Sequence, residues 1–216
     1  MPHPRNGYHT KDGTRVVSVT EVLKYKDPGP LMWWANKEGL AGRNHRDTSE
    51  KAATAGSLGH LLIETWAAGG DTDSVAGPPD ELAKARAGFK SFLRWAELTR
   101  LQIVKSEAEL VSEKYLFGGC LDSTMSVSLD GRLSLVDFKF SSGLYGEYLI
   151  QIAAYALLYE ECFPGDKIEE YHILRFSKEH CDFSHYSWMD LSMEKEAFLD
   201  LLHYHQKKVL IDKRAK

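Results

Sequence analysis

Residues 118–140 read GGCLDSTMSVSLDGRLSLVDFKF, two apolar runs separated by an Asp-Gly pair. An Asp-Gly pair in this position is typical of a β-hairpin with a two-residue turn. If the turn lies at residues 130–131, the pairing runs backward along both strands until Asp122 lies opposite Lys139. The stretch therefore predicts a hairpin near the middle of the chain.

Three charged side chains of this hairpin are predicted to share one face. Opposed residues of an antiparallel pair point to the same face, and side chains along each strand alternate between faces. Asp137 opposes Thr124 and precedes Lys139 by two residues, so it shares that face and is a diagonal neighbour of Asp122. We expect two carboxylates and one ammonium to converge on one patch of the sheet.

The return strand is apolar on both sides of this patch. Leu133 and Leu135 share the face of the charged groups, and Val136, Phe138 and Phe140 cover the other. Buried charges in proteins normally pair with each other or hold a metal ion. Two interpretations of the hairpin are open: a cation site, or a structural Asp-Lys ion pair at the wet end of a strand.

Composition and charge limit the class of protein. The chain has 216 residues, 43% hydrophobic and 27% charged, with a net charge of −4, which is ordinary for a soluble globular domain. This charge argues against a surface coated with positive charge, although a local basic groove is compatible with it. No apolar run approaches the ~20 residues of a membrane span. The first residues lack a signal peptide, so we expect a cytoplasmic protein with no membrane partner.

The periodicity of the chain predicts an α/β fold with a central mixed β-sheet flanked by helices, in one domain over 1–216. We expect an N-terminal hairpin and helices over 1–50, a core over 51–190 and a C-terminal helix over 191–216. Ser18 and Glu21 fit a capping box, and residues 44–49 are loop-like. Trp33 and Trp34 are expected to pack in the core, the alternative being that one of them stacks on a base. Strands are expected at 103–111, 118–129, 132–140, 169–176 and 182–188, and further helices at 52–68, 80–100, 147–163 and 193–213.

Two pairs of polar residues lie four apart on predicted helices. His60 and Glu64 share a face and form either a solvated pair or part of a site. Gln151 and Tyr155 interrupt a helix that is apolar almost all round. They form either a buried hydrogen-bonded pair, or a support for the carboxylate patch or a contact to a substrate.

Four stretches, in order, resemble the PD-(D/E)XK nuclease superfamily in its RecB-like branch: GSLGHLLIE at 56–64, GGCLD at 118–122, LVDFK at 135–139 and QIAAY at 151–155. They are most similar to phage exonucleases and the mitochondrial genome maintenance exonuclease, as are residues 18–20 and 33–35. Leu121 stands where the superfamily name has proline, and the second acid is Asp137 rather than glutamate. Neither departure changes the type of ligand.

The resemblance implies a restriction-endonuclease-like core that hydrolyses phosphodiesters with one or two Mg²⁺ or Mn²⁺ ions. It implies Asp122, Asp137 and Lys139 as catalytic residues. The implied metal ligands are His60, Asp122, Asp137 and the backbone carbonyl of Phe138, with Gln151, Tyr155 and Glu64 contacting substrate or supporting the site. Because imidazole suits softer ions better than Mg²⁺, Mn²⁺ is expected to work at least as well.

By the same analogy we expect a bacterial or phage-encoded DNA exonuclease that acts on single strands or free ends in repair or recombination. The alternatives are a structure-specific or restriction-type endonuclease and a catalytically silent nucleic-acid-binding module. The presence of Asp122, Asp137 and Lys139 together disfavours the silent module. The sequence leaves the oligomeric state open.

Overall fold

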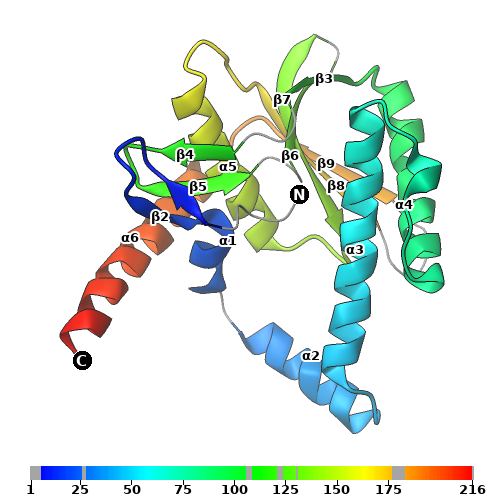
Figure 1. Cartoon of the computed structure of the whole chain (residues 1–216), viewed down its shortest axis with the longest axis horizontal. Coiled ribbons are helices and arrows are strands. Elements are labelled where there is room, and N and C mark those ends of the chain that lie inside the picture. Colours follow the sequence, from blue (N-terminus) through cyan, green and yellow to red (C-terminus); the bar gives the residue numbers. More distant parts are fainter. Residues whose placement is uncertain are drawn as a thin grey trace.

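The computed structural model describes residues 6–25, 28–105, 109–120, 124–129, 131–176 and 183–215, with only the backbone described at 124–126. Within these residues it is an α/β fold of two sheets and flanking helices, which confirms the predicted class (Figure 1). The larger sheet has the strand order β3-β6-β7-β8-β9, and the smaller has the order β1-β2-β5-β4. The smaller sheet was not predicted.

The strands are β1 (Tyr8–His9), β2 (Arg15–Ser18), β3 (Gln102–Lys105), β4 (Glu109–Ser112), β5 (Phe117–Cys120), β6 (Thr124–Leu129), β7 (Arg132–Phe140), β8 (Glu170–Phe176) and β9 (Phe183–Trp188). The α-helices are α1 (Val19–Val22), α2 (Gly29–Leu40), α3 (His45–Ala67), α4 (Pro79–Leu98), α5 (Gly146–Cys162) and α6 (Ser192–Arg214). Two short 3-10 helices are η1 (Leu23–Tyr25) and η2 (Thr72–Ser74).

The predicted hairpin is formed by β6 and β7. Leu129 pairs with Arg132 and Thr124 with Asp137, which is the predicted register. Gly131 has φ +83, a backbone conformation that glycine adopts without a Cβ penalty. On its other side β7 pairs in parallel with β8, so β7 is a central strand. The predicted turn residue Asp130 and the predicted partner of Lys139, Asp122, lie outside the described residues.

The prediction of one continuous strand over 103–111 is wrong. The structure has two strands there: β3 pairs with β6 in the larger sheet, and β4 pairs with β5 in the smaller one. The strand predicted over 118–129 likewise divides into β5 and β6. Alternation of apolar residues indicates a strand but not its partner, and β5 finds a distant parallel partner in β2, where Val17 pairs with Phe117.

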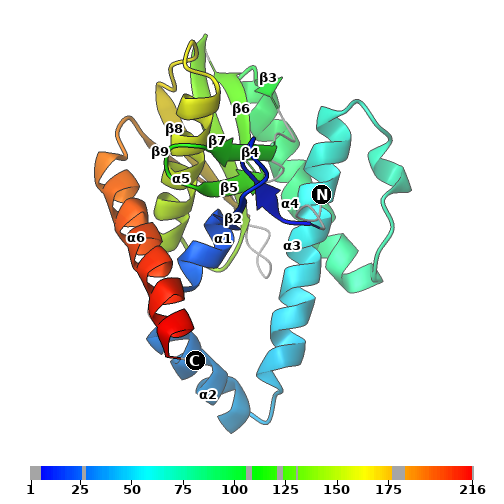
Figure 2. The same cartoon turned by 60° about the vertical axis from the view of Figure 1, so that its left-hand side comes forward.

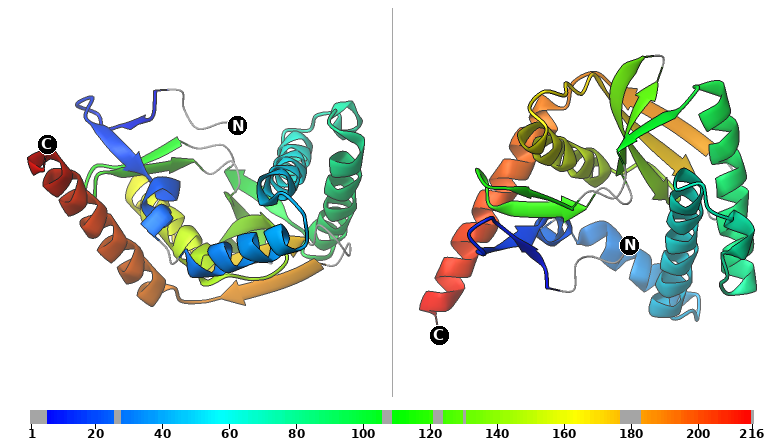
Figure 3. Two further views of the ribbon diagram at one scale, coloured as in Figure 1. Left: turned by 90° about the horizontal axis from the view of Figure 1, so that it is seen from below. Right: turned by 45° about the horizontal axis from the view of Figure 1, so that its top comes forward.

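Helices cover both faces of the larger sheet. Leu135 of β7 belongs to a core with α5, whereas Val136, Phe138 and Phe140 belong to a second core with α3 and α4. Figure 3 shows α3 and α4 on one side of the sheet and α5 and α6 on the other. This arrangement confirms that Leu135 and Val136 face opposite sides, and it leaves little room for unpaired charge on β7.

The N-terminal segment agrees with its predicted local structure up to α2. Ser18 caps α1 and accepts a hydrogen bond from the Glu21 amide at 3.1 Å. The predicted loop at 44–49 is wrong, because α3 begins at His45 and the Asn44 side chain caps it by accepting from the Arg46 amide.

Helix α2 lies apart from both sheets, beside the N-terminal end of α3 (Figure 2). Trp33 is 67% exposed, which corrects the expectation that it packs, while Trp34 is partly buried. Among the described helices, none combines the length and the apolar character that a membrane crossing requires.

Candidate active site

The centre of the candidate site is an ion pair on β7. The Asp137 side chain is 0% exposed, and its Oδ2 lies 2.6 Å from the Lys139 Nζ. The prediction that these two residues share a face is therefore confirmed. A carboxylate loses favourable hydration when it is buried, so it needs a cation at close range. Lys139 supplies one such cation within the described structure.

Side chains of helix α5 hold the Lys139 ammonium in position. The Lys139 ammonium donates to Gln151 Oε1 at 2.8 Å, and Gln151 Nε2 donates to the Tyr155 hydroxyl at 3.4 Å. Tyr155 is buried, and its ring packs so closely on β5 that a Cβ at Gly119 would lie 2.9 Å from it. Tyr155 thus fixes Gln151 from within the core, and Gln151 in turn fixes Lys139.

Tyr148 was not singled out from the sequence. The Lys139 Nζ lies over its ring, 5.0 Å from the centroid. Burial raises the pKa of the Tyr148 phenol, and the charges of nearby acids, Asp137 among them, add to this effect. The signal that could have found it is helical spacing, because Tyr148, Gln151 and Tyr155 follow one another at i, i+3 and i+7 on one face of α5.

Arg175 is a second residue that sequence analysis missed. It is adjacent to Lys139 in the parallel register of β7 and β8, and it is buried. Its guanidinium donates to the Ser141 carbonyl at 3.2 Å and to the Ser184 hydroxyl at 3.0 Å. Two cations on neighbouring strands therefore accompany Asp137, which makes this end of the sheet compatible with an anionic ligand.

His60 and Glu64 lie on α3, which covers the other face of β7. The His60 ring packs edge-on against Phe140 and Phe138, with centroid distances of 5.6 and 6.5 Å. Glu64 follows one helical turn later and is partly buried. The Phe138 side chain is part of the same core, and its main chain joins Asp137 to Lys139. The imidazole and the ion pair thus approach β7 from opposite sides.

One of the two predicted carboxylate ligands lies within the described residues. Asp137 provides a hard oxygen donor of the kind that Mg²⁺ and Mn²⁺ prefer, but Asp122 lies outside the described residues. Within the parts of the chain that are described, no three His, Cys, Asp or Glu side chains gather as a metal-binding group. The donor chemistry of Asp137 therefore fits a divalent cation.

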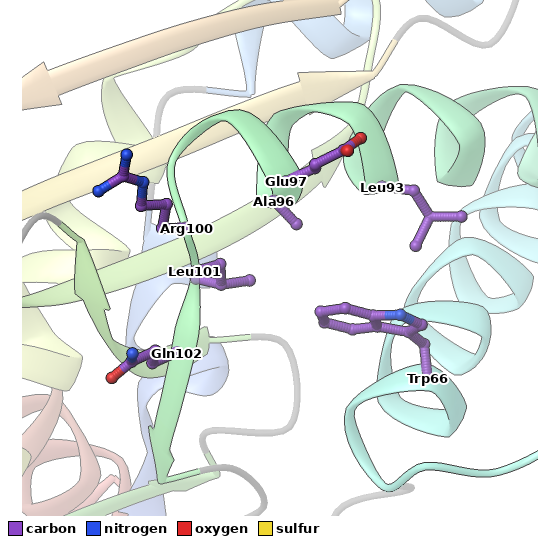
Figure 4. A pocket seen from close by; sticks show the side chains of 7 residues that line it. All are labelled: Trp66, Leu93, Ala96, Glu97, Arg100, Leu101 and Gln102. Carbon is purple, nitrogen blue, oxygen red and sulfur yellow. The ribbon is translucent and has the colours of Figure 1, made fainter.

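Cavities found elsewhere do not include the predicted site residues. One of about 500 Å³ lies between the ends of α3 and α4 and the start of β3, and Figure 4 shows Trp66 and Leu93 facing it. Another of about 600 Å³ lies between α2 and the start of α3. Neither is lined by Asp137, Lys139 or Gln151, so the ion pair is distinct from both cavities.

Comparison with known proteins identifies a solved structure of similar fold. No family model and no curated protein matches the sequence. A solved structure from Eubacterium rectale, described as that of a proposed exonuclease, is similar with a TM-score of 0.51 and 14% sequence identity, over 74% of this chain and 68% of that chain. The structure of SSO0001 aligns with a TM-score of 0.36 and 16% identity over 71% and 72% of the two chains, too weakly to carry an argument. The chain therefore shares its α/β fold with the Eubacterium rectale protein.

Proposed function

We propose that this protein is a metal-dependent DNA nuclease that acts as an exonuclease on single strands or free DNA ends. The observation that carries the proposal is the fully buried Asp137 carboxylate in contact with the Lys139 ammonium on a central strand. The fold shared with a proposed exonuclease supports it at the level of architecture.

The alternative, a purely structural ion pair, explains the site less well. A structural pair stabilises little at the surface and is expensive in the interior, where apolar residues of similar volume often serve as well. Here the pair occupies the central strand and is surrounded by dedicated polar partners on α5, namely Gln151 and, behind it, Tyr155. A set of buried polar groups that hydrogen-bond to one another in this way is typical of functional sites.

In this proposal Asp137 and Asp122 hold one or two Mg²⁺ or Mn²⁺ ions, with the Phe138 carbonyl as a further candidate ligand. His60 packs on the opposite face of β7 from the Asp137 carboxylate, so it serves either as a ligand from that side of the strand or as a support behind the ligands. When bound, the cation supplies charge neutralisation and a more acidic water. The chain's own part is to place a positive group beside the scissile phosphate. Lys139 donates a hydrogen bond to the attacking water or to a phosphate oxygen, and Gln151 keeps the ammonium in its position.

The test is a cleavage assay with end-labelled single-stranded DNA, linear duplex and covalently closed circles, each with Mg²⁺, Mn²⁺ or EDTA. Asp137→Asn and Lys139→Met are the inactivating variants. Lys105→Met is the matched control, because Lys105 forms another Lys-Asp pair, with Asp166 at 2.8 Å, outside the site. We expect metal-dependent loss of linear DNA from its ends, abolished by the first two substitutions and retained in the control.

Other outcomes discriminate among the alternatives. Cutting of closed circles would identify an endonuclease. Binding of DNA without cleavage under any metal would identify a silent binding module. Equal activity of Asp137→Asn and the unmodified protein would remove the ion pair from the mechanism altogether.

A further inference from the structure

We propose that Tyr148 is a positioning residue whose ring holds the Lys139 ammonium in place for the reaction. This inference rests on the proposed nuclease function, because it assigns a role in the same site. Tyr148 acts through Lys139 rather than on the substrate.

The surroundings of the ammonium define this role. Lys139 Nζ has the Asp137 carboxylate at 2.6 Å, the Gln151 amide oxygen at 2.8 Å and the Tyr148 ring centroid at 5.0 Å. The first two accept hydrogen bonds or share charge, and the third presents an aromatic face to a cation. A cation within about 6 Å of a ring centroid is attracted by the ring quadrupole, most strongly where water is excluded.

The Tyr148 ring is itself fixed. The Tyr145 ring packs against it edge-on, with centroids 5.4 Å apart and an interplanar angle of 84°. The side chain is partly buried, and this burial raises the pKa of the phenol, so the hydroxyl stays neutral. A ring fixed in this way loses little entropy when it binds the ammonium.

The contact between the Tyr148 ring and the Lys139 ammonium matters most when the Asp137 carboxylate binds a metal ion. A divalent cation bound to the Asp137 carboxylate would compete with the Lys139 ammonium for it, since like charges repel. Neither the Tyr148 ring nor Gln151 depends on that carboxylate. These two groups therefore retain the ammonium near the site while Asp137 serves the metal.

The first test separates the aromatic face from side-chain bulk. Position 148 is replaced by Phe, by mono-, di- and trifluorinated Phe, and by Leu. Fluorine withdraws electron density from the ring face, so the cleavage rate should fall stepwise along the series while Tyr148→Phe stays near the unmodified rate. For Tyr148→Leu we expect a loss of roughly 3- to 30-fold, the factor that corresponds to ~0.7 to 2 kcal/mol. A Leu variant as active as the Phe variant would overturn the proposal.

The second test needs neither metal nor activity. In protein with ¹³C-labelled lysine, kept in EDTA, the Lys139 ε-methylene protons should be shifted upfield by the Tyr148 ring current, with Lys139→Arg identifying the signal. Tyr148→Phe should keep the shift and Tyr148→Leu should lose it. Trp33→Leu is the matched control, because Lys37 lies over the exposed Trp33 ring at 5.4 Å and only its signal should move.

The two tests distinguish the two failures. An unmodified protein that cleaves no DNA but keeps the ring-current shift would overturn the nuclease function, and with it the positioning role in catalysis. A Lys139 signal that is the same in the Leu variant and the unmodified protein would overturn the positioning role alone, even in an active enzyme.

Discussion

Phe140 of β7 packs directly against Gly59 of α3, so closely that a Cβ at position 59 would overlap the phenyl ring. On its other side the ring meets α4, where a Cβ at Gly88 would lie 2.8 Å from it. The absence of two side chains thus lets both helices approach the strand that carries Asp137 and Lys139.

Substitution Gly59→Ala should destabilise the protein. Alanine gains about 1 kcal/mol of helix propensity over glycine, but overpacking of a core costs about 1 to 3 kcal/mol, and the buried Phe140 ring lies between α3 and α4. The net loss should appear as a lower urea midpoint with an unchanged slope. Gly39→Ala in α2, where a Cβ meets nothing within 4 Å, is the control and should leave stability equal or higher. A stabilised Gly59→Ala would contradict the close packing.

The Asp137–Lys139 pair should be strongly coupled in stability. Lys139→Met leaves a carboxylate buried without its cation, which typically costs about 3 to 5 kcal/mol. Adding Asp137→Asn removes that charge, so the double variant should be more stable than Lys139→Met alone. Denaturation in EDTA measures both, and strict additivity of the two substitutions would show that the pair is not coupled.

A buried histidine network predicts loss of stability in acid. Trp95 Nε1 donates to His185 Nδ1 at 3.3 Å, so the His185 proton is on Nε2, which faces His172 Nδ1 at 2.9 Å. His172 Nε2 then carries the remaining proton and lies 3.3 Å from Glu170 Oε2, while Arg132 pairs with the other Glu170 oxygen at 2.7 Å. Both imidazoles are therefore neutral in this arrangement.

Burial, followed by the charges of His185 and Arg132, lowers the pKa of His172 from 6.5 to about 4. Burial also lowers the pKa of His185, against the opposing charge of Glu170. Between pH 6.5 and 4 the unfolded chain binds a proton that folded His172 does not, so stability falls as pH falls. For His172 the total is about 3 kcal/mol. Unfolding free energies across this window should show the slope, and His172→Gln should flatten it. An unchanged slope in that variant would refute the assignment.

Metal preference tests the predicted role of His60. Imidazole is a better ligand for Mn²⁺ than for Mg²⁺, so initial cleavage rates in Mn²⁺ should equal or exceed those in Mg²⁺, and His60→Ala should reduce the Mn²⁺ rate more. The contacts with Phe138 and Phe140 hold the His60 imidazole beside β7 whichever metal ion is supplied. A strict Mg²⁺ preference would argue against direct ligation by His60.

Local signals in the sequence predicted much of the fold. The turn chemistry at Gly131 and strand alternation fixed the register of β6 and β7 to the residue, because both act over neighbouring positions. The apolar character of residues 147–163 similarly predicted α5, which starts one residue earlier and ends one residue earlier. The same register predicted that the side chains of Asp137 and Lys139 share one face of the sheet, as they do in the structure.

Features that depend on distant partners could not be predicted. The division of residues 102–112 between two sheets is decided by the pairing of β3 with β6 and of β4 with β5, which no local pattern identifies. The contact of Tyr148 with Lys139 depends on how α5 crosses β7, and a tyrosine in an apolar helix is most often a core residue. Asn44 was assigned to a loop because polar residues dominate the first turns of α3, and that polarity reflects exposure.

The parallel pairing of Val17 with Phe117 joins segments one hundred positions apart. During synthesis on the ribosome, the hairpin of β1 and β2 emerges well before β5. It therefore has no sheet to join until the intervening one hundred residues have been made. Contacts of such long sequence separation form slowly. Strands β1 and β2 should consequently be among the last parts of the chain to gain protection against hydrogen exchange during refolding.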